Sequence, residues 1–210
     1  MLPSAIQYRV FDLDAVAVDM GLLSAEERAR VERKRTPLLR QRQAASFQCL
    51  RETLGAVLGL PPAGLTVARR EGGKPYLPGQ ALGFNLSHSE GIGLLAWGPG
   101  ELGVDIEALI ARPGEALGRE ILTPAEFGAW QSQPEAMRQA WLTRAWCRKE
   151  AVLKAFGEGL RIAPGRLELG GGDGEGRAWV CRFEGRECLG HDLVADIPAG
   201  YCAALCLLAS

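Results

Sequence analysis

The order of its elements is the feature that most constrains the fold of this 210-residue chain. A short alternating apolar segment comes first, and two helical segments and then short β-prone segments separated by glycines follow it. Helical segments and then strands recur in the second part of the chain. Because consecutive strands joined by short turns pair antiparallel, this order predicts an α+β fold.

Local periodicity and turn residues place the individual elements. Ser24 and Glu27 have the spacing of a capping box that starts a first helix, and Pro37 breaks the helical pattern. The other expected helices span 38–58, 119–130 with a restart at Pro124, and 135–156. The expected strands span 6–18, 66–70, 84–88, 92–97, 102–107, 179–183, 189–197 and 201–208, and those between 66 and 107 are expected to form an antiparallel meander. The glycine-rich stretch 170–176 is expected to be a surface loop or a hairpin connection.

The repeated order of elements predicts two similar α/β halves, residues 1–100 and 101–210, related by a pseudo-two-fold axis. Each half is expected to have a small antiparallel sheet and a long helix. No low-complexity linker separates the halves, which favours one compact unit with an extensive mutual interface.

Composition excludes several classes of protein. A formal charge of −1 with 23% charged residues argues against both intrinsic disorder and a generally basic nucleic-acid binder. The first ten residues contain no apolar core of signal-peptide length, and the apolar run 201–209 is too short to span a bilayer. We therefore expect a cytoplasmic protein that binds neither a membrane nor nucleic acid. One local anion-binding patch is expected at 28–51, a segment that contains eight basic residues and a single acidic one.

Six cysteines and two histidines limit the metal chemistry. The cysteines lie among apolar neighbours and form no Cys-x-x-Cys pair, so reduced and mostly buried thiols are expected. Two histidines are too few for a His-rich zinc site, so any metal would be held by carboxylates.

The segment 103–107 places two carboxylates together. In a strand, Asp105 and Glu107 point to one face while Val104 and Ile106 point to the other. Two neighbouring carboxylates favour a hard divalent cation such as Mg²⁺. The alternative is a half-buried edge strand with a solvated polar face.

A second set of polar residues shares one face of the expected helix 135–156. Trp146, Glu150 and Lys154 follow one another at intervals of four residues. Glu150 and Lys154 have the spacing of an ordinary helix-stabilising ion pair. Alternatively, Glu150 is a third oxygen ligand beside Asp105 and Glu107, and Lys154 neutralises a phosphate on the same ion.

Two further segments contain polar groups suited to phosphates. Ser87 and His88 are adjacent in a strand and face opposite ways, so they cannot act on each other as nucleophile and base. They could hold phosphate oxygens at a strand end or simply cap a turn. The glycines before Lys74 let backbone and ammonium approach an anion closely, but the Walker spacing is absent.

Taken together, the segments 73–75, 85–89, 103–107 and 146–154 resemble the motif series of the 4'-phosphopantetheinyl transferases, and their spacing fits the long, surfactin-type members. The resemblance covers about residues 28–165. It implies two similar α+β halves with coenzyme A and Mg²⁺ in the cleft between them. It also implies a monomer that contains every part of one site and binds one coenzyme A.

The resemblance implies roles for the acidic residues and for one lysine. Asp105, Glu107 and Glu150 match the metal carboxylates, and Lys154 matches the lysine near the pyrophosphate. Glu150 and Lys154 are the expected catalytic residues. The proton acceptor is either Glu150 or a metal-bound water.

The resemblance also implies contacts to coenzyme A. Lys74, Ser87 and His88 match positions that contact its phosphates and adenine end, and Arg42 matches the arginine that holds the 3'-phosphate. Two positions depart from the family pattern, because Glu26 and Ala29 stand where members often have lysines. Arg28 or Arg30 would substitute for those lysines in the phosphate site. Glu126 loosely resembles an acidic position of the pattern.

The implied reaction is attack by a serine hydroxyl of an acyl or peptidyl carrier protein on the β-phosphorus of coenzyme A. It transfers 4'-phosphopantetheine and releases adenosine 3',5'-bisphosphate. Two alternatives remain from the residues alone, a metal-dependent phosphohydrolase acting on a nucleotide or on coenzyme A, and a non-catalytic module that binds coenzyme A or a carrier protein.

Overall fold

The computed structural model describes residues 4–157, 161–171 and 178–208. This part of the chain mixes helices with small antiparallel sheets, so the predicted α+β class is confirmed. The helices are α1 (Ala25–Glu32), α2 (Pro37–Leu58), α3 (Glu115–Ile121), α4 (Pro124–Gln131) and α5 (Glu135–Phe156). The strands are β1 (Gln7–Asp12), β2 (Ala68–Arg69), β3 (Pro75–Tyr76), β4 (Leu82–Ser89), β5 (Ile92–Pro99), β6 (Leu102–Ala108), β7 (Glu168–Gly170), β8 (Ala178–Phe183), β9 (Arg186–Leu193) and β10 (Tyr201–Leu208).

The first sheet has the strand order β1-β5-β4 and packs against α2. Leu50 and Leu54 of α2 are buried in one apolar cluster with Phe84 and Leu95 of the sheet. The ends of α2 follow from its sequence. At the start, Pro37 is the first helical residue and the Thr36 side chain accepts a hydrogen bond from the Leu39 amide, and at the end Gly59 adopts a left-handed φ of 67°. The capping box predicted for the first helix is confirmed at the start of α1.

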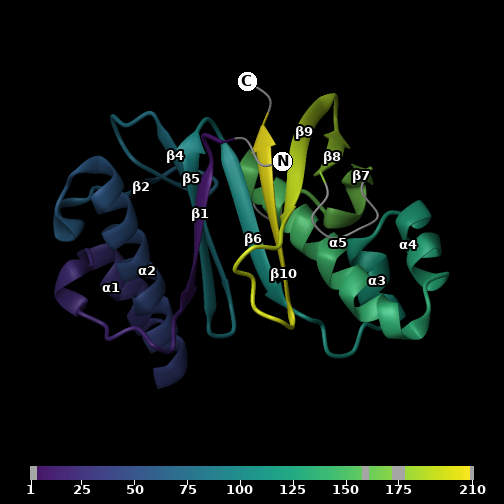
Figure 1. Ribbon diagram of the computed structural model, residues 1–210, viewed down its shortest axis with the longest axis horizontal. Helices are drawn as coiled ribbons and strands as arrows, with labels where there is room; N and C mark the ends of the chain where they lie inside the picture. The colour runs from purple at the N-terminus through teal and green to yellow at the C-terminus, as the bar shows by residue number, and fades with distance from the viewer. Residues whose placement is uncertain (1–3, 158–160, 172–177, 209–210) are drawn as a thin grey trace.

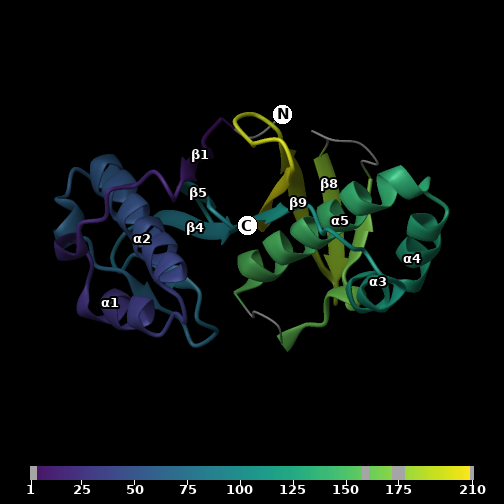
Figure 2. The same ribbon diagram turned by 90° about the horizontal axis from the view of Figure 1, so that it is seen from below.

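The second sheet has the order β6-β10-β9-β8-β7, and α5 lies against it (Figure 1). Figure 2 shows α1 and α2 at one end of the molecule and α3 and α4 at the other, with the two larger sheets between them. Apolar side chains of β5 and β6, among them Leu94, Ala96, Val104 and Ile106, share one buried cluster that joins the two sheets. The strand that holds the paired carboxylates therefore lies at the junction of the sheets.

Three strand predictions were wrong, one of them the expected strand 189–197, which ends at Leu193 in β9. The expected meander ends at β5, because β6 pairs along its length with β10, from Leu102 opposite Leu207 to Ala108 opposite Tyr201. The expected strand 6–18 ends at Asp12, whose carboxylate accepts hydrogen bonds from the amides of Asp14 and Ala15 and turns the chain.

The helix predictions for 38–58, for 135–156 and for the restart at Pro124 are confirmed, to within one residue for the first two. The structure adds the short strands β3 and β7, which the sequence did not predict. Of the glycine-rich stretch 170–176, residues 172–176 lie outside the described residues. All six cysteines are thiols outside disulfide bonds, and five of them are buried, as expected. None of the helices in the described ranges has the length and hydropathy needed to cross a bilayer.

The close approach of α5 to β6 depends on Gly103. A Cβ atom at this position would lie 2.2 Å from the Ala151 carbonyl oxygen and 2.3 Å from the Ala155 amide nitrogen, both backbone atoms of α5. Backbone atoms cannot rotate away as a flexible side chain can. Any side chain at position 103 must therefore move the helix that carries Glu150 and Lys154.

We expect Gly103→Ala to lower the free energy of unfolding by about 1–3 kcal/mol, because it overpacks this contact. A denaturant titration measures the change. Gly114→Ala is the matched control, since a Cβ there meets nothing within 4 Å. Equal stability of the two variants would contradict the contact.

Candidate active site

Alternate polar side chains of β4 cross the junction between the sheets and contact β6. The Asn85 side-chain oxygen accepts a hydrogen bond from the Val104 amide at 2.9 Å. Ser87 Oγ donates to Asp105 Oδ1 at 2.8 Å, and Ser89 Oγ donates to Glu107 Oε2 at 2.8 Å. Since alternate residues of a strand share one side, the segment 85–89 acts as a row of side-chain links between the two sheets.

Asp105 is the centre of this group. It is 2% exposed, and Oδ1 accepts hydrogen bonds from Ser87 and, at 2.5 Å, from the Lys154 ammonium. Lys154 also donates to Ser87 Oγ at 2.7 Å. Asp105 Oδ2 is buried and has no hydrogen-bond partner among the described residues. A buried carboxylate oxygen without a partner is costly, so this atom is suited to a cationic ligand.

Glu107 is held on both oxygens. Oε2 accepts from Ser89, and Oε1 accepts from the Trp146 indole nitrogen at 3.2 Å. Burial and the nearby charge of Asp105 raise the pKa of Glu107, while the hydrogen bonds from Ser89 and Trp146 partly oppose the increase. The indole therefore links α5 to the second carboxylate of β6.

Glu150 and Lys154 complete the predicted face of α5. Burial and the charges of Asp105 and Glu107 raise the pKa of Glu150, although Lys154 opposes them. Glu150 Oε1 is buried without a hydrogen-bond partner in the described ranges. Burial alone would lower the pKa of Lys154, but its contacts with Asp105 and the charge of Glu150 raise it above the usual value. Since Trp146 and Lys154 contact β6 and Glu150 is electrostatically coupled to its carboxylates, the predicted shared face is confirmed.

The group as a whole holds three carboxylates and one ammonium. In the described ranges, no set of three or more acidic, His or Cys side chains is gathered closely enough to hold an ion as it stands. The donor chemistry nevertheless fits Mg²⁺, because Asp105 Oδ2 and Glu150 Oε1 are buried oxygens without partners and Glu107 lies beside them. These residues could therefore hold a hard divalent cation after closing around it.

His88 is exposed and lies on the opposite side of β4 from Ser87. Partial desolvation, with the nearby charges of Lys34, Lys154 and Arg42, lowers the pKa of His88. The side chain thus lies among three cations contributed by different parts of the chain, an environment that would attract an anion.

Arg42 and Lys74 are both paired with acids. Arg42 donates from Nε and Nη2 to Asp14 at 2.7 Å each. The Lys74 ammonium is buried and donates to Glu101 at 2.7 Å and to the Ala155 carbonyl at the end of α5 at 2.8 Å. Burial lowers the pKa of Lys74 despite the charge of Glu101. The structure places Lys74 at the C-terminal end of α5 rather than among the carboxylates.

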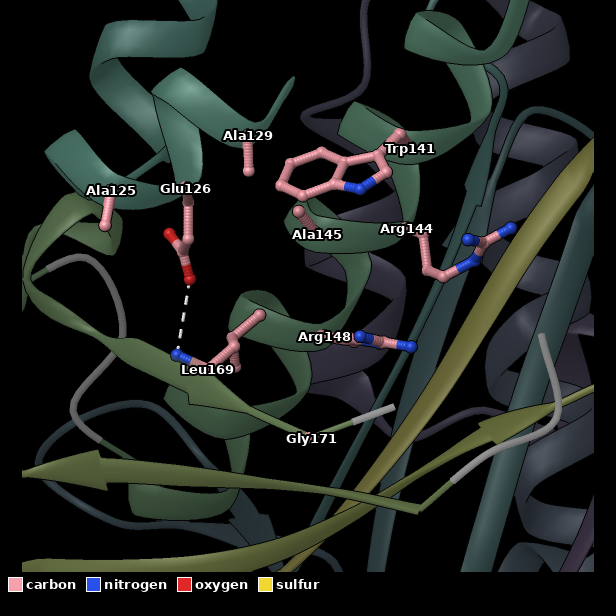
Figure 3. Close-up of a pocket in the computed structure, with 9 residues that line it drawn as sticks. All are labelled: Ala125, Glu126, Ala129, Trp141, Arg144, Ala145, Arg148, Leu169 and Gly171. Atoms are coloured by element: carbon pink, nitrogen blue, oxygen red, sulfur yellow. Dashed lines mark hydrogen bonds between the residues drawn. The ribbon is translucent and has the colours of Figure 1, made fainter. Parts of the chain in front are cut away.

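The remaining residues named from the family pattern make structural contacts. Arg28 donates to the Leu23 carbonyl, and Arg30 pairs with Glu26 at 3.8 Å. Glu126 closes the capping box of α4 and accepts a hydrogen bond from the buried Lys149 at 2.5 Å. Glu126 also lines a separate cavity of about 250 Å³ between α4, α5 and β7. There it accepts a hydrogen bond from the Leu169 amide (Figure 3).

The sequence alone assigned no role to Asn85 or Ser89. It placed Trp146 on the same helix face as Glu150 and Lys154 but did not indicate which residue the indole contacts. The structure shows that these three side chains fix β6 and Glu107. Their alternation with Ser87 along β4 was the available signal for the first two. No local pattern could identify β6 as the strand that they contact.

Comparison with known proteins gives a family for this arrangement. The model of the 4'-phosphopantetheinyl transferase superfamily matches residues 101–206. The chain is 36% identical over 146 residues to the 4'-phosphopantetheinyl transferase HetI of Nostoc sp., covering 66% of this chain and 61% of that protein. It is 28% identical over 145 residues to a 4'-phosphopantetheinyl transferase of Bacillus subtilis, covering 68% of this chain and 64% of that protein.

Among solved structures, the holo-[acyl-carrier-protein] synthase of Thermotoga maritima matches 51% of this chain and 62% of its own, at 19% identity and a TM-score of 0.40. The chain spans less than two thirds of the length of the two sequence relatives. The family model covers half of the chain, including Asp105, Glu107, Glu150 and Lys154, and the resemblance seen in the motifs is confirmed. The chain belongs to the 4'-phosphopantetheinyl transferase superfamily.

Proposed function

We propose that this chain transfers the 4'-phosphopantetheine arm of coenzyme A to a serine of an apo acyl or peptidyl carrier protein. The reaction would depend on Mg²⁺ and release adenosine 3',5'-bisphosphate. The observation that carries the proposal is the cluster at the sheet junction, in which Asp105, Glu107, Glu150 and Lys154 lie together on β6 and α5. The relatives named as 4'-phosphopantetheinyl transferases support it.

The carboxylates would bind the metal through the oxygens that lack partners. Asp105 Oδ2 and Glu150 Oε1, with Glu107, would hold Mg²⁺, which when bound supplies positive charge to the diphosphate and the leaving phosphate. Ser89 and Trp146 keep Glu107 in place for this role. Lys154 stays protonated because its pKa is raised, and its ammonium would stabilise negative charge that develops on the leaving group.

Glu150 is the proposed proton acceptor for the serine hydroxyl, directly or through an intervening water. Without a bound cation, burial and the charges of Asp105 and Glu107 raise the pKa of Glu150. A carboxylate that holds Mg²⁺ is a weaker base, so the intervening water is kept as the alternative acceptor. Ser87 donates a hydrogen bond to Asp105 and accepts one from Lys154, so it would hold the carboxylate and the ammonium in fixed positions relative to each other. Coenzyme A would extend from this cluster past His88 towards Arg42. The phosphate contact that the motif implies for Lys74 would require its ammonium to leave Glu101 and the Ala155 carbonyl.

Intact mass spectrometry tests the function. Several apo carrier proteins are incubated with the chain, coenzyme A and Mg²⁺, and we expect the mass of one phosphopantetheine arm to be added. A carrier with its acceptor serine replaced by alanine is the control. Consumption of coenzyme A without any carrier would indicate the phosphohydrolase instead, and binding without consumption would indicate a binding module.

Arg42 is the proposed contact for the 3'-phosphate. We expect Arg42→Ala to weaken binding of coenzyme A by about tenfold, because a charge-assisted pair with a phosphate monoester is lost. Binding of 3'-dephospho-coenzyme A should change little. Calorimetric titration measures both affinities, and equal weakening towards the two ligands would contradict this assignment.

We also propose that residues 1–100 and 101–210 act as two halves of one monomer. The predicted site residues are divided between the two halves but belong to one chain, and the buried cluster that includes Leu94 and Val104 joins the halves. We expect sedimentation to give a monomer and titration to give one coenzyme A per chain. Two equivalent sites, or activity lost on dilution, would contradict the prediction. The cytoplasmic location likewise stays a prediction.

A further inference from the structure

Two acidic residues hold Arg42 in different ways. Asp14 accepts two hydrogen bonds of 2.7 Å from Nε and Nη2, which form one edge of the guanidinium. Glu90 accepts one bond of 3.3 Å from Nη1, which belongs to the other edge. A guanidinium offers two such edges to a carboxylate or a phosphate, so Asp14 fills one edge and Glu90 only partly occupies the second.

Asp14 is a fixed partner. Its backbone amide donates to Asp12, and the neighbouring Leu13 amide donates to the Gly91 carbonyl at 2.7 Å, which ties this loop to the turn between β4 and β5. The turn leaves no spare space, because a Cβ at Gly91 would lie 2.6 Å from Asp14 Oδ2 and 3.4 Å from Arg42 Nη2. The packing therefore holds the Asp14 carboxylate against one edge of the guanidinium.

Glu90 is a looser partner. Its side chain is 68% exposed, against 45% for that of Asp14, and it makes a single longer contact with Arg42. Exposed ion pairs of this kind contribute little. Glu90 also has a φ of 50°, which is uncommon for a residue with a side chain and directs attention to function. The contact is therefore weak enough for a dianion to replace.

We propose that Glu90 occupies the position of a ligand phosphate monoester on Arg42 and leaves when the phosphate binds, while Asp14 positions the guanidinium to receive it. The second edge of Arg42 can donate hydrogen bonds to two phosphate oxygens only where the Glu90 carboxylate now lies. The surroundings favour such an exchange, because the positive charges of Lys34, Lys154 and Arg42 all act on His88. The inference rests on the proposed function in taking coenzyme A as the ligand, and it makes Glu90 a residue that sets affinity for the 3'-phosphate.

Calorimetric titration of two variants tests the proposal, with coenzyme A and 3'-dephospho-coenzyme A as probes. Glu90→Gln keeps the size and backbone preference of the residue and removes its charge, so affinity for coenzyme A should rise about two- to fivefold. Asp14→Asn should weaken coenzyme A about fivefold, because the guanidinium loses its positioning partner. Neither change should alter affinity for the dephospho probe by as much as twofold.

Two controls separate competition at Arg42 from the general electrostatic field. Glu187→Gln removes the same charge from an exposed ion pair with Arg182 and should not change either affinity. In an Arg42→Gln background, Glu90→Gln should no longer tighten coenzyme A. A gain that survives in this background, no gain from Glu90→Gln, or tighter binding by Asp14→Asn would overturn the proposal. Because binding is measured without a carrier protein, a chain that shows these shifts but transfers nothing would overturn only the proposed function.

Discussion

Asp105→Ala is expected to reduce the rate of phosphopantetheine transfer by about 10²–10³-fold, the usual cost of removing a strong electrostatic group from an active site. Asp105 is the side chain that contacts both Lys154 and Ser87. Without it, the ammonium loses its carboxylate partner, and the proposed Mg²⁺ would lose an oxygen that has no other bond among the described residues. Transfer rates are measured by mass spectrometry at saturating coenzyme A, and chelation of the metal should give a similar loss in the unchanged chain.

The same substitution should leave the fold intact. Asp105 Oδ2 has no hydrogen-bond partner among the described residues, so removing the carboxylate also removes a buried polar atom that is not compensated. Lys154 keeps access to solvent, because its side chain is 27% exposed. The thermal midpoint of Asp105→Ala should therefore stay close to that of the unchanged chain.

Asp192 supplies a matched control for this separation of activity from stability. Its side chain is 5% exposed, against 2% for that of Asp105, but both oxygens accept bonds from Arg148 and one also accepts from the Trp179 indole. Asp192→Ala leaves Arg148 buried without this carboxylate and should cost about 3–5 kcal/mol of stability. Full transfer activity in Asp105→Ala, or instability equal to that of Asp192→Ala, would contradict the role assigned to Asp105.

Local patterns predicted the parts of the site that depend on one element. The alternation of residues 103–107 placed Asp105 and Glu107 on one face of a strand, and the spacing of four residues placed Glu150 and Lys154 on one face of α5. Caps and breaks at Ser24, Pro37 and Pro124 likewise depend on nearby residues, and the structure has all of them.

Contacts between distant segments could not be predicted in the same way. The strand β6 leaves the expected meander because its partner is β10, about a hundred residues later, and no local signal identifies that partner. The pairing of Arg42 with Asp14 and Glu90 joins a helix, a loop and a turn, so a motif containing Arg42 does not reveal it. Register and long-range packing determine these contacts, and both depend on the whole fold.

Lys149 shows a further limit of a motif. It lies directly before Glu150 in the segment that carries the resemblance, and a lysine there suggests a phosphate contact as readily as a structural one. In the structure its side chain is 0% exposed and points away from the cluster of Asp105, Glu107 and Glu150. It donates to the Ile121 carbonyl at 2.9 Å and to Glu126 at 2.5 Å, and so fastens α5 to α3 and α4.

Lys149→Met should lower the free energy of unfolding by about 3–5 kcal/mol, the range for breaking one side of a buried ion pair. The methionine fills the space but leaves the Glu126 carboxylate and the Ile121 carbonyl without their donor. Burial already lowers the pKa of Lys149, so the charge is tolerated only because Glu126 lies against it. Denaturant titration measures the loss, with Arg166→Met as control, because the exposed pair of Arg166 with Glu184 should contribute less than about 1 kcal/mol.

The double variant Lys149→Met, Glu126→Gln separates the ion pair from packing. Removing the second charge should recover a large part of the lost stability, because an uncompensated buried carboxylate is the main cost. Glu126→Gln alone should also destabilise the chain, since its oxygens serve the Thr123 and Leu169 amides as well as Lys149. Stability of Lys149→Met equal to that of the Arg166→Met control would show that the pair does not anchor α5. The helix would then be held against β6 by the contact at Gly103 and the apolar residues beneath it, rather than by a buried charge on its opposite side.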